Sequence, residues 1–224
     1  MVTIADRSVL VLGATGALGS RIASRLHERG ARLTLAGRDE SALADLGLPG
    51  RLVRADLRVA ADCARVVADA VDEHRELHGV VNAAGVVAFG DVVDLDDATL
   101  DELFETDVKG PLRVVREALP HLGDGSFVAQ ITGVVADQPV AGMAAYSAVK
   151  AALASATAAL AREVRRDGVT VIDVRPPHTE TGLAGRAIAG TAPRFPEGAD
   201  PDHVADRIVA AIEEGERVVE ADAF

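Results

Sequence analysis

The sequence has little of what proteins outside the reducing cytoplasm usually carry. Cys63 is the single cysteine in 224 residues, so no disulfide bond can form within the chain. The first residues show no basic stretch followed by a signal-type apolar run, and no apolar run is long enough to cross a bilayer. We therefore expect a cytoplasmic protein in which Cys63 is a small buried residue.

Positive charge is also scarce, because 23 Lys and Arg residues stand against 35 Asp and Glu residues. The net charge of −12 argues against a nucleic-acid partner or an anionic membrane surface. Candidate metal ligands are few: His74 and His78 are four residues apart, but no third ligand is near them, and a solvated helix face explains the pair. A small molecule is the expected partner, and no metal is expected.

What the chain does contain is a regular alternation of strand and helix patterns. Residues 9–12 lie in a continuous apolar run, which is typical of a buried parallel strand. Residues 17–27 follow with helical spacing, because Leu18, Ile22 and Leu26 stand four apart on one face. The chain therefore begins with a strand that leads directly into a helix.

The same pattern repeats along the chain. Further strands are expected at 31–36, 52–55, 79–83, 126–131, 169–174 and 217–219, and further helices at 39–46, 59–74, 96–122, 143–166 and 202–214. Such alternation predicts an α/β protein, with a Rossmann-type doubly wound parallel sheet in three αβα layers. We expect residues 1–224 to form a single domain, with a helix kink at Gly110-Pro111 and an irregular lid at 182–200.

Gly13, Gly16 and Gly19 mark the turn between the first strand and the first helix. Glycine permits a positive φ there and lets the backbone approach a phosphate, because no Cβ stands in the way. The N-terminus of the helix offers free N–H groups and a partial positive charge to an anion. The turn predicts a dinucleotide site. A glycine turn without a ligand is the alternative.

The second strand ends at Gly37-Arg38, where a carboxylate would select NAD by binding ribose hydroxyls. Gly37 instead leaves space, and the planar guanidinium of Arg38 suits a phosphate, so NADP(H) is favoured over NAD(H). An ordinary surface arginine is the alternative. Asp56, after the third strand, fits either an acceptor for the adenine amino group or a helix N-cap.

Two further motifs lie where the carboxyl ends of strands are expected. The Asn-Ala-Ala-Gly segment 82–85 follows the fourth strand, and its small residues let the backbone run close to a flat ligand. Tyr146, the only tyrosine, and Lys150 share one helix face. A free tyrosine has a pKa of about 10, and a lysine one turn away lowers that pKa by stabilising tyrosinate. A pair on a solvated helix face is the alternative.

Together these motifs resemble the short-chain dehydrogenase/reductase family, in its compact single-domain branch. The resemblance covers about residues 8–219 and rests on Gly13-x-x-Gly16-x-x-Gly19, Asp56, Asn82-Ala83-Ala84-Gly85, Tyr146-x-x-x-Lys150, Pro176 and Thr181. It implies hydride transfer between a nicotinamide and a carbonyl or alcohol, with Tyr146 as the general acid or base. Lys150 would lower the pKa of Tyr146 and hold the nicotinamide ribose, and Thr181 would contact the carboxamide. The cofactor contacts implied in this way are Gly13, Thr15, Gly16, Leu18, Gly19, Arg38, Asp56, Leu57, Asn82, Ala83, Ala84, Gly85, Tyr146, Lys150, Pro176 and Thr181.

Three departures from the family's pattern concern the site. Leu12 and Ala17 replace a threonine and a glycine of the usual T-G-x-x-x-G-x-G turn, a variation that leaves the phosphate site intact. Asp107 stands where the family has an asparagine whose main chain helps to hold a water in a proton relay. Gly133 stands where the family has the serine that polarises the carbonyl, and Thr132 takes that role only if the loop slips by one residue. The implied catalytic residues are Tyr146, Lys150, Thr132 and Asp107.

The favoured interpretation is an NADP(H)-dependent oxidoreductase that acts on a carbonyl or alcohol of a small to medium apolar substrate. A catalytically weak NADP(H)-binding sensor or scaffold of the same fold is the alternative, favoured by Gly133 and Asp107. His178 is placed where it is able to touch the substrate. Helices around 112–119 and 151–160 are rich in small and apolar residues. They favour a homodimer or homotetramer, unless that face packs on the sheet.

Overall fold

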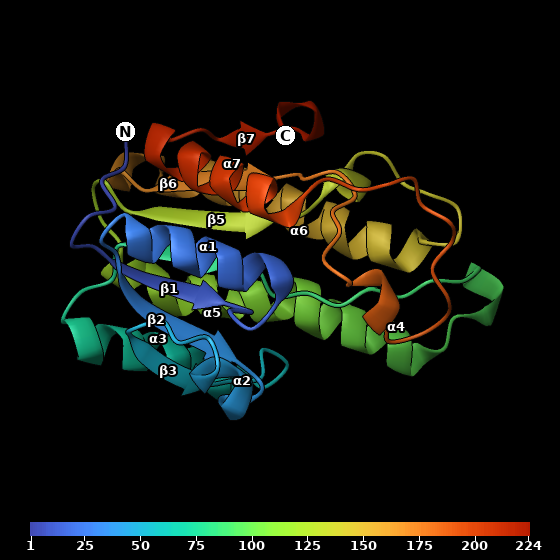
Figure 1. Cartoon of the computed structure of the whole chain (residues 1–224), viewed down its shortest axis with the longest axis horizontal. Helices are drawn as coiled ribbons and strands as arrows, with labels where there is room; N and C mark the ends of the chain where they lie inside the picture. The colour runs from blue at the N-terminus through green and yellow to red at the C-terminus, as the bar shows by residue number, and fades with distance from the viewer.

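Seven parallel strands form the central sheet, in the order β3–β2–β1–β4–β5–β6–β7 (Figure 1). The computed structural model describes residues 1–224. The strands are β1 (Ser8–Leu12), β2 (Arg32–Gly37), β3 (Arg51–Arg54), β4 (Gly79–Asn82), β5 (Phe127–Ile131), β6 (Thr170–Val174) and β7 (Val218–Val219). The direction of winding reverses between β1 and β4, and such a switch point is where ligands of doubly wound sheets bind. The predicted doubly wound parallel sheet is confirmed.

Seven α-helices and several short turns connect the strands. The α-helices are α1 (Ala17–Glu28), α2 (Glu40–Ala44), α3 (Ala60–His74), α4 (Asp97–Phe104), α5 (Gly110–Ala118), α6 (Ala144–Glu163) and α7 (Pro201–Glu214). A π-helical turn occupies Glu105–Lys109, and 3-10 turns lie at Val92–Asp94, Leu119–His121, Val134–Ala136, Val164–Asp167, Ala184–Arg186 and Ala221–Ala223.

Helices cover both faces of the sheet, because successive strand side chains point to opposite faces. On one face, Val9 and Val11 of β1 pack with residues of α1, α2 and α7. On the other face, Leu10 and Leu12 pack with residues of α3, α5 and the end of α6. In Figure 1, α1 and α7 lie side by side over the sheet. All five residues of β1 are buried, as the continuous apolar run predicted.

The helix kink expected at Gly110-Pro111 is instead a π-helical turn that lies one turn earlier. α4 continues into the π-helical turn Glu105–Lys109, and α5 begins at Gly110. Pro111 has no N–H to donate, so the hydrogen-bond pattern of the helix changes in the turn before it. A Cβ on Gly110 would lie 2.7 Å from the Cβ of Leu57, so glycine lets this segment pack against the loop after β3. The π-helical turn is important because it carries Asp107 into the interior.

One helix is more apolar than expected. The segment Ala144–Asp167, which includes α6, contains an 18-residue window with a mean hydropathy of 1.2 and is long and apolar enough to cross a membrane by length and composition alone. The expectation that no run is long enough is therefore wrong for this segment. One such helix is a weak indication, because core helices share these properties. α6 packs against β5 and β6 and carries the buried Lys150.

The predicted lid, residues 182–200, lies against the loop that follows β4. It contains one 3-10 turn and is otherwise irregular. The Ile188 N–H donates to the Val87 carbonyl at 2.8 Å, and the Phe89 N–H donates to the Ala189 carbonyl at 2.9 Å. The lid is thereby attached to the loop after β4 by backbone hydrogen bonds.

Candidate active site

The glycine turn between β1 and α1 leaves backbone N–H groups uncovered and free to donate hydrogen bonds. Gly13 has a φ of +70°, and a Cβ on Gly19 would lie 2.1 Å from the Gly13 carbonyl oxygen. Gly16 is the N-cap of α1, and no side chain caps the helix. The backbone N–H groups of residues 17–19 find no acceptor within the protein. A helix N-terminus of this kind attracts an anion, so the turn fits the phosphates of a dinucleotide.

Gly37 and Arg38 lie next to this turn, at the end of β2. A Cβ on Gly37 would lie 3.2 Å from the side chain of Thr15, so the glycine keeps this corner open. The side chain of Arg38 is exposed, while its backbone carbonyl accepts a hydrogen bond from Arg54 Nε at 3.3 Å. Arg38 is therefore free to meet a phosphate.

Asp56 is held by Arg58 and does not cap a helix. Its Oδ2 lies 2.7 Å from Arg58 Nη2, and its Oδ1 accepts the Arg58 backbone N–H at 3.0 Å. This pairing keeps the pKa of Asp56 below its ordinary value, although burial acts in the opposite direction. The N-cap alternative is wrong, because α3 begins at Ala60 and its N-cap is Val59. The adenine contact of Asp56 stays a prediction.

Asn82 ties the carboxyl ends of two neighbouring strands together. Its Nδ2 donates to Gln130 Oε1 of β5 at 2.8 Å, and its Oδ1 accepts the Ala84 N–H at 3.3 Å. The amide is buried, and its two bonds fix the course of the loop after β4. Gln130 was not predicted from the sequence, because nothing local marks a glutamine in a buried strand as the partner of Asn82.

Tyr146 and Lys150 lie in the first turns of α6, as their spacing predicted. Lys150 is 5% exposed, and its Nζ donates to the Ile131 carbonyl at 3.1 Å and lies 5.6 Å from the centre of the Tyr146 ring. The ring packs against apolar residues that include Phe89 and Met143. The solvated-face alternative is thereby wrong for Lys150.

The electrostatics of this pair differ from the expectation in one respect. Burial raises the pKa of Tyr146, and Lys150 lowers it by less, so the pKa lies above its ordinary value. The expected lowering by Lys150 is present, but burial outweighs it. Burial lowers the pKa of Lys150, but Tyr146 and Asp107 together raise it by more, so Lys150 keeps its proton.

Asp107 points into the interior from the π-helical turn. Its Oδ1 accepts the Val86 N–H at 2.9 Å, whereas its buried Oδ2 has no hydrogen-bond partner. Burial raises the pKa of Asp107 to about 6, and Lys150 and the Val86 N–H offset only part of this effect. A Cβ on Gly85 would lie 3.0 Å from Asp107 Oδ1 and 3.3 Å from Lys150 Nζ. Glycine at position 85 therefore leaves these two groups close together.

The Thr132 hydroxyl is engaged within the protein. Its Oγ1 lies 2.5 Å from Asp173 Oδ1 and donates there, and Asp173 Oδ2 in turn accepts a hydrogen bond from Arg175 Nε at 2.8 Å. The Thr132 hydroxyl is thus used within a buried polar network of β5 and β6. Because the one hydroxyl proton is already donated to Asp173, this arrangement argues against a catalytic role for Thr132, which stays a prediction.

Gly133 has a backbone conformation that other residues rarely adopt. Its φ is +85° and its ψ is 159°, in a region populated almost only by glycine. A Cβ there would be 4.0 Å from the Pro176 carbonyl oxygen, so the space beside Gly133 is open. A serine at this position would therefore be strained by the backbone conformation and not by crowding. No side chain at position 133 polarises a substrate carbonyl.

The loop after β6 carries Pro176, His178 and Thr181. The Pro176 carbonyl accepts the Val134 N–H at 3.0 Å, which joins this loop to the turn at Gly133. The His178 ring stacks on Phe195 of the lid, with ring centres 4.7 Å apart. The Thr181 hydroxyl accepts the Leu183 N–H at 3.3 Å. The predicted contacts of these residues with cofactor or substrate stay predictions.

A cavity of about 330 Å³ lies next to the first residues of α6, which precede Tyr146. Its walls come from the loop 88–90, from 143–145 at the start of α6 and from 189–190 of the lid, all of which are small or apolar. Three carboxylates of the loop 91–96 line the remaining side. The sequence did not reveal this cavity, because its walls come from segments far apart in the chain.

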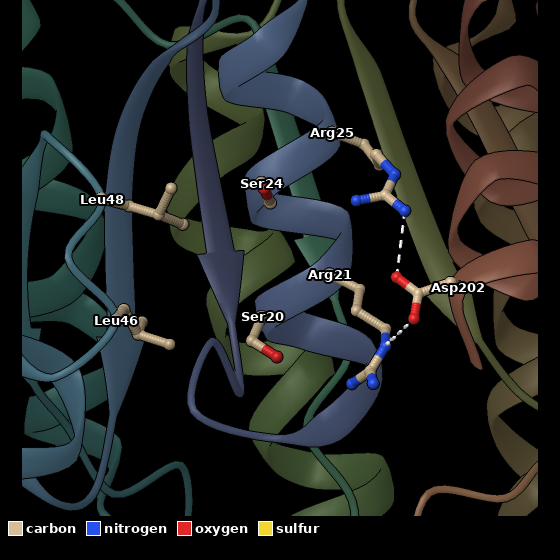
Figure 2. A pocket seen from close by; sticks show the side chains of 7 residues that line it. All are labelled: Ser20, Arg21, Ser24, Arg25, Leu46, Leu48 and Asp202. Carbon is tan, nitrogen blue, oxygen red and sulfur yellow. Dashed lines mark hydrogen bonds and ion pairs between the residues drawn. The ribbon is translucent and has the colours of Figure 1, made fainter.

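A second hollow, shown in Figure 2, is separate from this chemistry. It has a volume of about 210 Å³ and lies beside α1. Arg21 and Arg25 pair with Asp202 at 3.0 and 2.9 Å, so their charges are compensated within the protein. None of the predicted site residues lines it.

Comparisons with known proteins agree with this geometry. The family model described as short chain dehydrogenase matches residues 7–191. An uncharacterized oxidoreductase of Staphylococcus epidermidis is 27% identical over 218 residues, which is 95% of this chain and 93% of that protein. The chain belongs to the short-chain dehydrogenase family and has the fold of its oxidoreductases.

Solved structures place the same fold around nicotinamide cofactors. A short-chain dehydrogenase from Sphingobium yanoikuyae in complex with NADPH is 26% identical, with a TM-score of 0.85 over 96% of this chain and 87% of that one. A short-chain dehydrogenase/reductase from Burkholderia phymatum in complex with NAD is 22% identical, with a TM-score of 0.89 over 98% of this chain and 90% of that one. Structures of similar fold therefore include complexes with NADPH and with NAD.

Proposed function

We propose that the protein is an NADP(H)-dependent oxidoreductase that transfers hydride to or from a carbonyl or alcohol of a small to medium apolar substrate. The observation that carries the proposal is the pair of the half-buried Tyr146 and the buried Lys150 in the first turns of α6, next to residues 143–145, which line a cavity of mostly small and apolar residues. Family membership supports the reaction class.

The chain's own residues fit a bound dinucleotide. The free N–H groups of residues 17–19 donate to a phosphate, and Gly13 and Gly19 leave the space that the phosphates need. Lys150 and Thr181 hold the ribose and the carboxamide, as the family resemblance implies. When bound, the nicotinamide supplies or accepts the hydride.

The preference for NADP(H) rests on Gly37 and Arg38. We expect Arg38→Asp to weaken NADPH binding by at least about tenfold, because a charge-assisted phosphate contact is replaced by repulsion. NADH binding should change much less. Arg51→Asp is the matched control. Arg51 lies at the amino end of β3, away from the carboxyl edge of the sheet, so this change should leave both affinities unchanged. Equal loss for NADPH and NADH in Arg38→Asp would contradict the proposed preference.

Tyr146 is the proton donor in the reductive direction. It gives its phenolic proton to the substrate oxygen, while the Lys150 ammonium keeps its place through the Ile131 carbonyl. Removal of one preorganised donor from such a site typically costs about 10²–10³ in rate. Because Gly133 provides no hydroxyl, we expect low activity on simple ketones and higher activity on intrinsically electrophilic carbonyls.

The decisive experiment is NADPH oxidation with diketones, quinones, aldehydes and simple ketones, for the wild type and for Tyr146→Phe. We expect the wild type to turn over the electrophilic substrates and Tyr146→Phe to bind NADPH without turnover. Undiminished turnover by Tyr146→Phe would contradict the proposed mechanism.

A catalytically weak NADP(H)-binding sensor or scaffold is the second candidate. Two observations favour it, namely the raised pKa of Tyr146 and the absence of a hydroxyl at Gly133. Tight NADPH binding by the wild type, without turnover of any carbonyl in the panel, would decide for this candidate.

We also propose a homodimer or homotetramer in the cytoplasm. The outer face of α6 exposes the small residues Ala148, Ala151, Ser155 and Ala158, while its opposite face packs on the sheet. Light scattering coupled to gel filtration measures the oligomeric state, and a monomer at micromolar concentration would contradict this part of the proposal.

A further inference from the structure

Asp107 is a buried carboxylate that the proton transfer proposed for Tyr146 does not use. One oxygen accepts the Val86 N–H, and the other has no hydrogen-bond partner. An ionised carboxylate without a full set of donors is costly to bury, so a nearby positive charge must offset it or a proton must neutralise it.

Lys150 is the cation that faces Asp107. The two groups lie on either side of the position that a Gly85 Cβ would occupy, at 3.0 and 3.3 Å from it. Lys150 Nζ bonds to the Ile131 carbonyl and is 5.6 Å from the centre of the Tyr146 ring. The buried Asp107 and Lys150 and the half-buried Tyr146 therefore form one cluster of titratable groups.

The neighbouring elements bring no other charge to Asp107. On its own π-helical turn, Glu105 pairs with Lys109 at 2.8 Å and with Arg113 of α5 at 2.7 Å, near the surface. The loop after β4 contributes the Val86 N–H, and α6 contributes Lys150 and Tyr146. Lys150 is the single charged group that shifts the pKa of Asp107.

We propose that the Asp107 carboxylate is a counter-charge to Lys150 that holds the catalytic proton on Tyr146, and so adapts the site to reduction. A positive charge beside a tyrosine favours the phenolate, whereas a negative charge favours the phenol. Asp107 therefore cancels part of the effect of Lys150 on the same proton. Asp107 is a positioning residue in this scheme, because it acts on Tyr146 through charge and touches no substrate.

The directions in which the pKa values of both groups are shifted agree with this role. Burial raises the pKa of Asp107 to about 6, so the carboxylate is ionised at neutral pH and its charge is present there. Asp107 raises the pKa of Tyr146, in opposition to Lys150. The link to reduction rests on the proposed function, whereas the effect on the Tyr146 proton does not.

The composition of the chain allows a direct test. Tyr146 is the only tyrosine and there is no tryptophan, so the ultraviolet absorbance of tyrosinate reports this one residue. Asp107→Asn removes the charge but keeps an oxygen that accepts the Val86 N–H. We expect the pKa of Tyr146 to fall by about one pH unit in Asp107→Asn. Asp101→Asn, which removes an exposed carboxylate from α4, should leave the pKa of Tyr146 unchanged.

Circular dichroism marks the pH range in which each protein stays folded. If the wild type unfolds before Tyr146 ionises, the alkaline limb of NADPH-dependent reduction gives the same comparison, and it should move to lower pH in Asp107→Asn. A Tyr146 pKa or alkaline limb that is equal in wild type and Asp107→Asn overturns the proposal.

The outcome also separates this proposal from the proposed function. A shifted Tyr146 titration together with full turnover by Tyr146→Phe would refute the proposed reaction mechanism and leave the counter-charge standing. Loss of turnover in Tyr146→Phe with an unshifted titration in Asp107→Asn would do the reverse.

Discussion

Replacing Asp107 with asparagine should change how the stability of the protein depends on pH. Burial raises the pKa of Asp107 from 3.8 to about 6 in the folded protein. Because the folded-state pKa is the higher one, the unfolded chain gives up this proton first, and the folded state loses stability as the pH rises. The loss begins near pH 3.8 and is complete above about pH 6.

The size of the effect follows from the two pKa values. A change from 3.8 to about 6 corresponds to about 3 kcal/mol of unfolding free energy, at about 1.4 kcal/mol per pH unit. About half of this falls between pH 5 and pH 8. Lys150 keeps its proton throughout that range, so the loss of its counter-charge shifts the stability of the variant by the same amount at every pH.

Urea unfolding at several pH values between 5 and 8 measures this effect for the wild type, Asp107→Asn and Asp101→Asn. We expect the stability of Asp107→Asn relative to the wild type to increase by about 1.5 kcal/mol from pH 5 to pH 8. Asp101→Asn controls for the loss of one surface charge and should run parallel to the wild type. A curve for Asp107→Asn that also runs parallel would refute the buried, ionising carboxylate.

Two predictions concern the turn after β5. Thr132→Val should lower the unfolding free energy by about 1–3 kcal/mol, because Asp173 loses a buried donor, and should leave kcat unchanged; a lower kcat at unchanged stability would instead place Thr132 in the active site. Gly133→Ser and Gly133→Ala should each cost about 1–3 kcal/mol, or roughly 2–12 °C in Tm, because both add a Cβ at a φ of +85°. The serine variant should then reduce simple ketones at least about tenfold faster than the alanine variant. Equal rates would show that the hydroxyl does not reach the carbonyl.

Features that depend on neighbours in the chain were predictable from the sequence. The apolar run of β1, the glycines of the following turn and the four-residue spacing of Tyr146 and Lys150 each describe one local element. Parallel β–α order then places the carboxyl ends of the strands at one edge of the sheet. This is why the fold was predictable from the sequence and why Tyr146 and Lys150 were expected on one helix, where α6 places them.

Features that depend on distant partners were not predictable. Asp173, which accepts the Thr132 hydroxyl, is 41 residues away in the chain, and no local pattern marks it. The raised pKa of Tyr146 depends on burial by apolar segments around Phe89 and Met143. Asp56 shows the same limit, because an acid before a helix fits an N-cap, and only the structure reveals its pairing with Arg58.

The two departures at Gly133 and Asp107 act on the same step of the proposed reaction. Without a hydroxyl at position 133, the substrate oxygen receives its polarisation from Tyr146 alone. Asp107 keeps the proton on Tyr146, but by raising its pKa it also makes Tyr146 a weaker acid. If Tyr146 is a weak acid and no second hydrogen-bond donor is present, it protonates the carbonyl oxygen efficiently only in a substrate that readily accepts negative charge on that oxygen. The departures therefore reinforce each other, and together they favour carbonyls activated by an adjacent electron-withdrawing group over simple ketones.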